Sequence, residues 1–496
     1  HMRVLLWLLP LLMLVSCKDD PVPPPEEQAR PQPAWKDSIL YFVFVDRFAN
    51  GDPSNDAPAG PPVLPATDFQ GGDWAGVIQK LDEGYFDELG VNTLWLSVPL
   101  DNTSKTHGGG EEDIWYTAYH AYWPERLDQP EEHFGTMEDF KSLVDKAHAR
   151  GMNVIIDFAM NHLYIDSPVY QEHPEWFWPL EQTYDGVTKK CLCGQACSWD
   201  DEPERKRCWF TEYLPDLNYT VKPARDFMID SIISWVKETG VDGLRLDALK
   251  HVEDEFILEL RQRLKEEIDP DRSKPVLLIG ETFSGDPELL RYYVDPDRML
   301  DGQFDFALRA YIVGPVLRRT RSFEGQVFPI SMKELEEFMR KNDNFYGDGT
   351  MSTFLGNHDL PRSIHHAEDT PRFGFEWDLG WMPKDEPRPG LPLGTSAFER
   401  MANGFTVLFT LPGIPLIYYG DEIGMPGVGD PDNRRMMDFN RSGYTPGQLL
   451  LRDHLIKLAK IRGEHAALRH GQRTTLSVTD DTLAYEMKLE AESVYV

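Results

Sequence analysis

The fold is decided by the stretch Val241-Asp242-Gly243-Leu244-Arg245-Leu246-Asp247-Ala248-Leu249-Lys250-His251, a short apolar strand that ends in charged residues. Side chains alternate between the two faces of a strand, so Arg245 and Asp247 share one face. A guanidinium favours the ionised form of a neighbouring carboxylate. Such a carboxylate suits a nucleophile or an electrostatic stabiliser, although an isolated pair of this kind is equally often a structural ion pair.

Three other apolar runs end in polar residues of the same kinds. They are 153–157 leading to Asn161-His162, 276–280 leading to Glu281, and 352–356 leading to Asn357-His358-Asp359. The active sites of parallel α/β barrels lie at the C-terminal ends of the strands. The four stretches therefore predict a parallel barrel with catalytic carboxyl groups at one end.

In their order and in their residues, these stretches resemble the signature regions of the α-amylase family of glycoside hydrolases. A fifth stretch, Leu214-Pro215-Asp216-Leu217-Asn218, falls where that family has an additional motif. The resemblance extends from about Ser38 to about Met437. It implies an α/β fold, a (β/α)8 TIM barrel with an inserted domain B and a C-terminal β-sandwich domain C. The family members that it most resembles are neopullulanase-, cyclomaltodextrinase- and amylase-like.

The resemblance also implies the catalytic roles. Glycoside hydrolysis needs one ionised carboxyl group and one that stays protonated until it meets the leaving oxygen. Asp247 matches the family's nucleophile, Glu281 its acid/base, and Asp359 the third carboxylate, which holds sugar hydroxyls. The matching substrate-binding residues are His120, Tyr122, His162, Arg245, Lys250 and His358.

One substrate-binding stretch departs from the family pattern. Tyr119-His120-Ala121-Tyr122-Trp123 resembles the family's Tyr-His-Gly-Tyr-Trp, with Ala121 in place of the glycine. The resemblance assigns Tyr122 to stacking on the sugar at the cleavage site and His120 to hydrogen bonding with it. Without the resemblance, this stretch reads as an aromatic patch of the core.

The resemblance further implies calcium as the cofactor, at two sites. Oxygen donors spaced around a glycine are what a calcium loop requires, although such a stretch is also compatible with a plain loop. The ligands expected at the N-terminal site are Asn50, Asp52, Asn55, Asp56, Gly71 and Asp73. Those expected between the barrel and domain B are Asn161, Asp216 and the backbone carbonyl of His251.

The chain divides into segments of different character. We expect a signal peptide with a lipobox at 1–17, a proline-rich linker at 18–37, barrel at 38–162 and 221–463, domain B at 163–220, and the start of a truncated domain C at 464–496. The apolar run 4–15 is too short to span a bilayer. Leu14-Val15-Ser16-Cys17 resembles a bacterial lipobox, the alternative being an ordinary secretion signal. We therefore expect an exported protein of the cell envelope that is lipid-anchored at Cys17.

Four cysteines cluster in the predicted domain B. They are Cys191, Cys193, Cys197 and Cys208. Their spacing is not a standard zinc pattern. In an oxidising envelope we expect disulfides, with all three pairings open.

Composition and charge limit the partners. A net charge of -33 argues against nucleic acid and anionic membrane surfaces, because both would be repelled. The 41% hydrophobic content excludes global disorder. We expect a retaining hydrolase of α-1,4-glucosidic bonds in starch, glycogen or maltodextrins, with pullulan and cyclodextrins as further candidate substrates. The alternatives are a 4-α-glucanotransferase and, least favoured because all three acids are present, a non-catalytic glycan-binding lipoprotein. The sequence predicts no particular oligomeric state.

Overall fold

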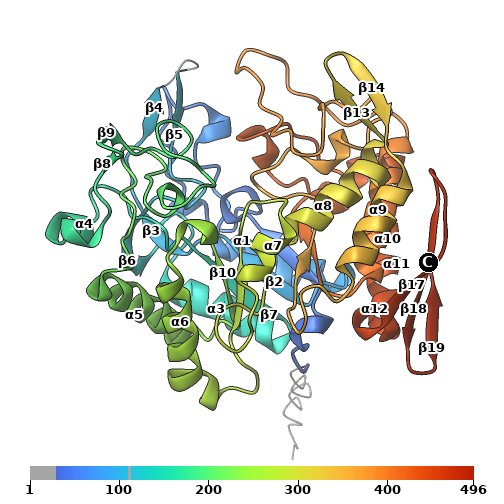
Figure 1. Cartoon of the computed structure of the whole chain (residues 1–496), viewed down its shortest axis with the longest axis horizontal. Helices are drawn as coiled ribbons and strands as arrows, with labels where there is room; N and C mark the ends of the chain where they lie inside the picture. The colour runs from blue at the N-terminus through green and yellow to red at the C-terminus, as the bar shows by residue number, and fades with distance from the viewer. Residues whose placement is uncertain (1–29, 110–112) are drawn as a thin grey trace, which may run out of the picture.

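The computed structural model describes residues 30–109 and 113–496, so the predicted signal peptide and Cys17 lie outside the described residues. Its central sheet has eight strands in the order β12-β11-β10-β7-β2-β1-β16-β15, and every pairing within it is parallel. A parallel bridge between Phe304 and Ser352 joins the two edges. The sheet is thus a nearly closed barrel, which confirms the predicted (β/α)8 fold (Figure 1).

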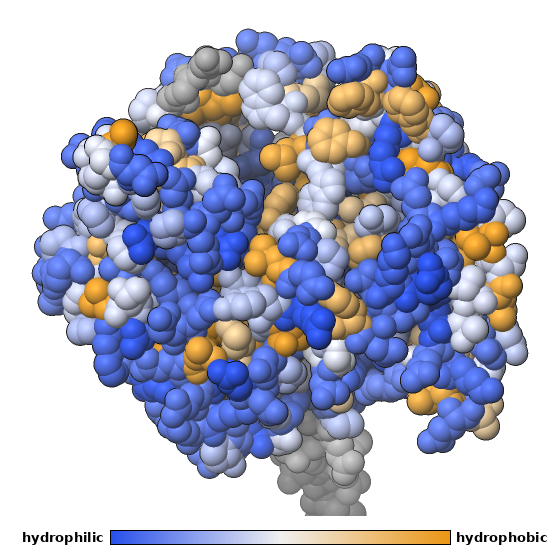
Figure 2. Space-filling model, in the orientation of Figure 1, coloured by the Kyte–Doolittle hydropathy of each residue, from blue (hydrophilic) through white to orange (hydrophobic). Residues whose placement is uncertain are grey.

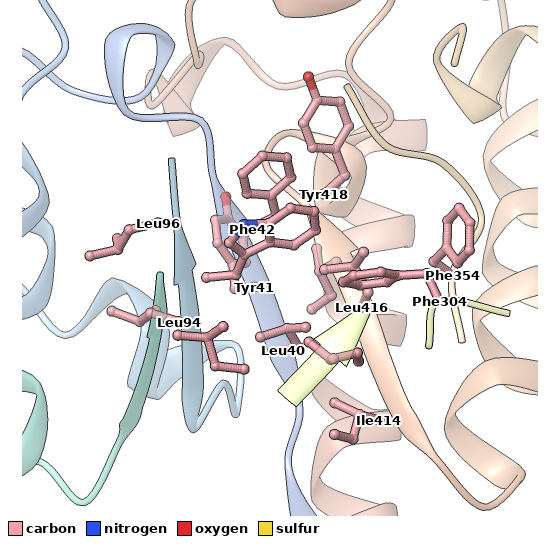
Figure 3. Close-up of a cluster of buried hydrophobic side chains, with 14 of the residues drawn as sticks. Leu40, Tyr41, Phe42, Leu94, Leu96, Phe304, Phe354, Ile414, Leu416 and Tyr418 are labelled. Atoms are coloured by element: carbon pink, nitrogen blue, oxygen red, sulfur yellow. The ribbon is translucent and has the colours of Figure 1, made fainter. Parts of the chain in front are cut away.

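The barrel strands are short and buried on both faces. Their bounds are β1 Leu40–Val43, β2 Thr93–Leu96, β7 Asn153–Phe158, β10 Gly243–Leu246, β11 Leu277–Gly280, β12 Gly302–Gln303, β15 Ser352–Thr353 and β16 Ile414–Tyr418. Apolar and aromatic side chains fill the interior, as Figure 3 shows for Leu40, Phe42 and Leu416. Phe42 stacks on Trp95, with 3.6 Å between the ring centroids. This packed interior closes the barrel below the strand ends that carry the charged residues.

Helices cover the outside of the barrel and separate its strands in the chain. Their bounds are α1 Trp74–Asp82, α2 Tyr85–Glu88, α3 Met137–Ala149, α4 Pro168–Glu172, α5 Lys222–Thr239, α6 Asp254–Glu267, α7 Pro287–Tyr292, α8 Phe306–Ile312, α9 Met332–Asn342, α10 Ser396–Thr410, α11 Pro446–Glu464 and α12 Ala467–His470. Gly84 takes a left-handed conformation (φ 76°) between α1 and α2 and so separates the two helices. Among the helices of the described residues, none is long and apolar enough to cross a membrane.

Two excursions rise from the C-terminal ends of the strands, on the left of Figure 1. The first holds two antiparallel strand pairs, β3 Leu100–Asn102 with β6 Pro124–Pro130 and β4 His107–Gly109 with β5 Ile114–Tyr116. The second, the predicted domain B, holds α4 and the hairpin of β8 Glu181–Tyr184 with β9 Val187–Lys190. Its disulfides join Cys191 to Cys197 and Cys193 to Cys208, which selects one of the three possible pairings.

The described end of the proline-rich segment packs on the barrel, which corrects the expectation that all of 18–37 is a spacer. Gln32 Nε2 donates to the carbonyl of Met152 (3.1 Å) and to Asp242 (3.2 Å). The Trp35 indole donates to the carbonyl of Pro275 (3.3 Å). These side chains satisfy polar groups at the N-terminal ends of the strands. The part of the chain that packs on the barrel therefore begins before residue 38.

The chain continues beyond α11 into a three-stranded antiparallel sheet. Its strands are β17 Gln472–Val478, β18 Leu483–Leu489 and β19 Glu492–Tyr495. Tyr485 and Met487 are buried against the barrel helices, and the Tyr485 hydroxyl lies 2.5 Å from Thr410 Oγ1 in α10. This sheet stands where the start of domain C is expected.

Candidate active site

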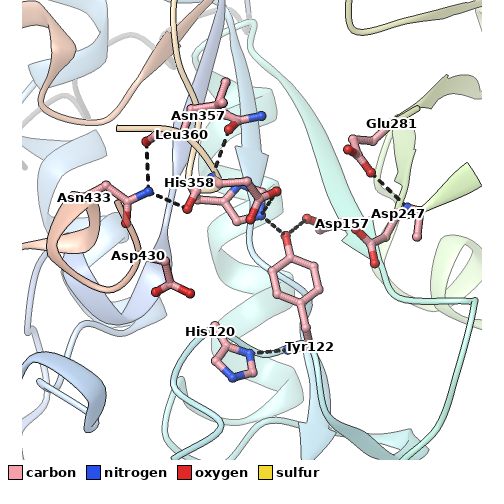
Figure 4. A network of polar contacts seen from close by, with 12 residues as sticks. His120, Tyr122, Asp157, Asp247, Glu281, Asn357, His358, Leu360, Asp430 and Asn433 are labelled. Atoms are coloured by element: carbon pink, nitrogen blue, oxygen red, sulfur yellow. Dashed lines mark hydrogen bonds and ion pairs between the residues drawn. The ribbon is translucent and has the colours of Figure 1, made fainter. Parts of the chain in front are cut away.

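The register of the central strands brings the predicted catalytic residues together. Arg245 on β10 lies opposite Asp157 on β7, and Leu246 lies opposite Gly280 on β11. The residues that follow these strands, Asp247 and Glu281, therefore emerge side by side. Figure 4 shows both carboxyl groups in one network with Tyr122 and His358.

Arg245 is the centre of this network. Its side chain is fully buried, and Nη1 lies 2.9 Å from Asp157 Oδ1 and 2.6 Å from Asp247 Oδ1. Nη2 lies 3.8 Å from Glu281 Oε2. Asp247 keeps 14% of its side chain exposed, so its outer oxygen remains open to a substrate. Arg245 thus places a fixed positive charge against Asp247.

The surroundings of Glu281 favour its protonated form, unlike the cation beside Asp247. Burial raises the pKa of its carboxyl group to about 7, and the nearby charges of Asp247 and Asp359 add to the rise. Arg245 opposes it but does not cancel it. The backbone N–H of Ala248 donates to Oε2 at 3.1 Å and fixes the side chain. A carboxyl group that keeps its proton near neutral pH can serve as a general acid.

Tyr122 joins the third carboxylate to this centre. Its hydroxyl donates to Asp157 Oδ2 (2.6 Å) and lies 2.9 Å from His358 Nε2. The same His358 nitrogen lies 3.4 Å from Asp359 Oδ2. Burial lowers the pKa of His358 well below its usual value, so the ring is neutral. The predicted residues Tyr122, Arg245 and His358 thus surround all three carboxyl groups.

The other predicted sugar-binding residues lie nearby with protein partners of their own. His120 Nδ1 accepts the backbone N–H of Tyr122 (3.0 Å), and His162 Nε2 lies 2.9 Å from the carbonyl of Tyr122. Both histidines therefore fix the backbone that carries Tyr122. Lys250 Nζ donates to Asp200 Oδ1 in domain B (2.5 Å) and to the carbonyl of Phe283 (3.2 Å), which places it on the Glu281 side.

Sequence reasoning missed two groups of residues. One is Asp157, whose role follows only from its register opposite Arg245. The other is the segment after β16. There, Arg434 Nη2 lies 3.4 Å from Asp359 Oδ1 and Nη1 lies 3.0 Å from Asp430. Asn433 Nδ2 donates to the carbonyl of His358 at 2.7 Å. The dense run of charged residues at 430–435 is the sequence feature that could have indicated this second group.

The predicted N-terminal calcium loop is rich in oxygen atoms. A cavity of about 140 Å³ is lined by Asn55, Asp56 and Gly71, among others. Asn55 Oδ1 is buried without a hydrogen-bond partner. A Cβ at position 71 would lie 2.5 Å from Asp56 Oδ1 and from the Asn50 amide, so only glycine leaves this space open. The donor set fits a hard cation such as calcium.

Two other residues predicted for that loop have structural partners. Asp73 caps α1, because its carboxylate accepts the backbone N–H groups of Gly51, Asp52 and Gly76. Asp52 Oδ1 accepts the N–H and the hydroxyl of Ser54. Both carboxylates therefore stabilise the loop itself, whatever else they bind.

The second predicted calcium site also has free oxygen atoms. Asn161 Oδ1 and Asp216 Oδ2 are buried, and neither has a hydrogen-bond partner. Burial and the charge of Glu253 raise the pKa of Asp216 well above its usual value. The His251 ring, which bonds the carbonyl of Arg205 in domain B at 2.6 Å, stands at the same junction. Buried oxygen atoms without a donor fit a bound cation.

Comparisons with known proteins agree with this geometry. Residues 42–455 match the family described as "Alpha amylase, catalytic domain". A cyclomaltodextrin glucanotransferase of Geobacillus stearothermophilus is 29% identical over 490 residues, which cover 92% of this chain and 58% of that protein. The chain thus spans less than two thirds of that relative.

Solved structures give closer matches in length. An Anoxybacillus α-amylase superposes with a TM-score of 0.73 at 30% identity, covering 94% of this chain and 87% of that one. The α-amylase of Geobacillus thermoleovorans, complexed with acarbose, gives 0.71 at 31% identity with the same coverage. The chain therefore belongs to the α-amylase family of glycosidases.

Proposed function

We propose that the protein hydrolyses α-1,4-glucosidic bonds of starch, glycogen or maltodextrins with retention of configuration. The observation that carries the proposal is the contrast between two neighbouring carboxyl groups. Arg245 contacts Asp247 at 2.6 Å, whereas burial raises the pKa of Glu281 to about 7. One group is paired with a fixed cation and the other keeps its proton, which is the contrast that a retaining mechanism uses.

The mechanism follows from these two states. Glu281 donates its proton to the glycosidic oxygen while an oxygen of Asp247 attacks the anomeric carbon, which gives a covalent glycosyl ester. Glu281 then takes a proton from water, and that water displaces Asp247 from the anomeric carbon. Each step inverts the anomeric carbon, so the α configuration is retained. Asp359 and His358 face the ring, where added binding in the transition state raises the rate.

A second candidate activity is transglycosylation on the same glucans. It differs only in the last step, where a sugar hydroxyl displaces Asp247 instead of water. The cyclomaltodextrin glucanotransferase among the relatives supports it. Product analysis after parallel incubation with starch, pullulan and cyclodextrin separates the two, because hydrolysis creates new reducing ends and transfer does not.

The test of the mechanism uses substrates that differ in leaving group. Glu281→Gln should lose nearly all activity on starch but still react with α-maltosyl fluoride, since fluoride leaves without a proton. Asp247→Asn should fail on both substrates because no carboxylate remains to form the ester. The first product of the unmutated enzyme should be the α-anomer. An early β-anomer by NMR would exclude retention.

We also propose that the protein binds calcium and carries a lipid anchor. Two calcium ions would be held by the N-terminal loop, through Asn55, Asp56 and Gly71, and by Asn161 with Asp216. Calcium would neutralise buried oxygen atoms there and stabilise the loops around the barrel. The lipobox supports export to the cell envelope with an anchor at Cys17.

A further inference from the structure

The loop that follows Asp359 contains a segment fixed at both ends. We call residues 374–381 the wall segment. Near its start, the buried Glu376 pairs with Arg321 (2.7 Å), and its carbonyl accepts Arg309 Nη1 (2.8 Å). Near its end, the carbonyl of Gly380 accepts the N–H of Gly429 at 2.7 Å. Because these contacts hold both ends, the wall segment has a defined place beside the site.

The two ends contact different parts of the site. Trp377 packs on Phe283, with 6.1 Å between the centroids. Phe283 follows Glu281 closely in the chain, and its carbonyl accepts a hydrogen bond from Lys250. Gly380 contacts Gly429, the neighbour of Asp430. The wall segment thus runs from the leaving-group side of the site to the side of Asp430.

Three large apolar side chains of this segment face solvent. Phe375 is 48% exposed, Leu379 53% and Trp381 62%. Figure 2 shows a recess near the top of the molecule, between domain B and the loops drawn in orange in Figure 1. Exposed apolar groups gathered on one short segment mark a binding surface. Aromatic rings offer large, rigid, apolar faces, which match the apolar face of a glucose ring.

We infer that Trp381 binds a glucose unit beyond Asp430, at the end of the recess remote from the leaving group, and so gives the enzyme a preference for long glucans. This inference rests on the proposed function. Trp381 follows Gly380, which is bonded to Gly429, and Asp430 lies 3.0 Å from Arg434, which in turn contacts Asp359. Trp381 thus directly follows the residue that holds the wall segment to the loop of Asp430 and Arg434.

The test compares a short and a long substrate with one leaving group, p-nitrophenyl α-maltoside and p-nitrophenyl α-maltoheptaoside. Trp381→Ala should raise KM for the heptaoside about tenfold and leave kcat unchanged, because a remote contact binds ground state and transition state equally. Both constants for the maltoside should stay the same. Trp381→Phe, which keeps a ring, should recover most of the loss.

Tyr495→Ala is the matched control, since Tyr495 is a 68% exposed aromatic residue on β19 of the C-terminal sheet. Tyr495→Ala should change neither KM nor kcat for either substrate. Three outcomes would each overturn the inference and leave the proposed function intact. They are equal KM changes for both substrates, an unchanged heptaoside KM in Trp381→Ala, and the same effect in Tyr495→Ala. If the unmutated protein cleaves neither substrate nor starch, the proposed function fails, and this inference fails with it.

Discussion

Arg245 and Asp157 lie opposite each other on β10 and β7, with 2.9 Å between Nη1 and Oδ1, and neither side chain is exposed. The same nitrogen of Arg245 lies 2.6 Å from Asp247. Asp157 therefore fixes the guanidinium nitrogen that also contacts the nucleophile. Tyr122 donates its hydroxyl to the other oxygen of Asp157 at 2.6 Å. One buried carboxylate thus orients two groups that face the sugar.

Asp157→Asn should lower kcat on starch about 100-fold, since small displacements of catalytic groups have effects of this size. The amide keeps the volume but lacks the charge that holds Arg245, and Tyr122 loses a charged acceptor. KM should change less, because Asp157 itself does not touch substrate. The reaction with α-maltosyl fluoride should slow as well, because the attack by Asp247 is affected and not the proton donation by Glu281.

The control is Asp242→Asn. Asp242 immediately precedes β10 at its other end and is equally buried, and it pairs with His148 (2.8 Å) and Arg272 (3.1 Å). Its loss should lower the melting temperature without lowering kcat. A similar fall of kcat in both variants would mean that Asp157 acts on stability alone.

The juxtaposition of Asp247 and Glu281 could be predicted because each directly follows an apolar strand. In a parallel barrel, strand ends meet at one face, so Asp247 and Glu281 become neighbours once β10 and β11 pair. Local sequence carries this information. The same reasoning placed Arg245 beside Asp247, two residues apart on one strand.

Contacts between distant segments could not be predicted in this way. Arg245 and Asp157 are 88 positions apart, and their contact depends on the register of two strands. Arg434 and Asp359 are 75 positions apart and meet through loops, which have no periodicity to read. The packing of Trp35 on the barrel depends on a tertiary contact in the same way.

The lipid anchor is tested in cells. Cys17→Ser should move the protein from the membrane fraction to the soluble fraction, because the acylated residue is lost. Activity per molecule should stay the same, since the active site lies far along the chain from residue 17. If the unmutated protein carries no lipid in its native host, the anchor does not exist.

Calcium should raise the melting temperature, because a ligand that binds only the native state stabilises it, by about 2.7 kcal/mol at 100 times its Kd. Asp56→Asn should remove the gain from the N-terminal loop and Asp216→Asn the gain at domain B. Asp56 is a better choice than Asp73, because Asp73 also caps α1 and its loss destabilises the protein without calcium. Melting curves with calcium and with chelator measure both effects. Identical curves would exclude both sites.

The last prediction concerns pH and Glu281, whose pKa is raised from its usual 4.5 to about 7 by burial. The proton is bound more tightly in the native state than in the unfolded state. Below pH about 4.5 both states are protonated, so the group costs no stability. Between about 4.5 and 7 the unfolded state gains by ionising, and above 7 the native state has lost about 3 kcal/mol.

Glu281→Gln cannot ionise, so it should be more stable than the unmutated protein at pH 8, by up to about 3 kcal/mol, and equally stable at pH 4. Thermal or urea unfolding at both pH values measures the difference. Glu266→Gln, at an exposed position of α6, is the control and should show no such dependence. Activity on starch should fall above pH about 7 as Glu281 loses the proton that it must donate. If Glu281→Gln has the same relative stability at pH 4 and pH 8, burial does not hold the proton on Glu281, and the assignment of Glu281 as the acid loses its electrostatic basis.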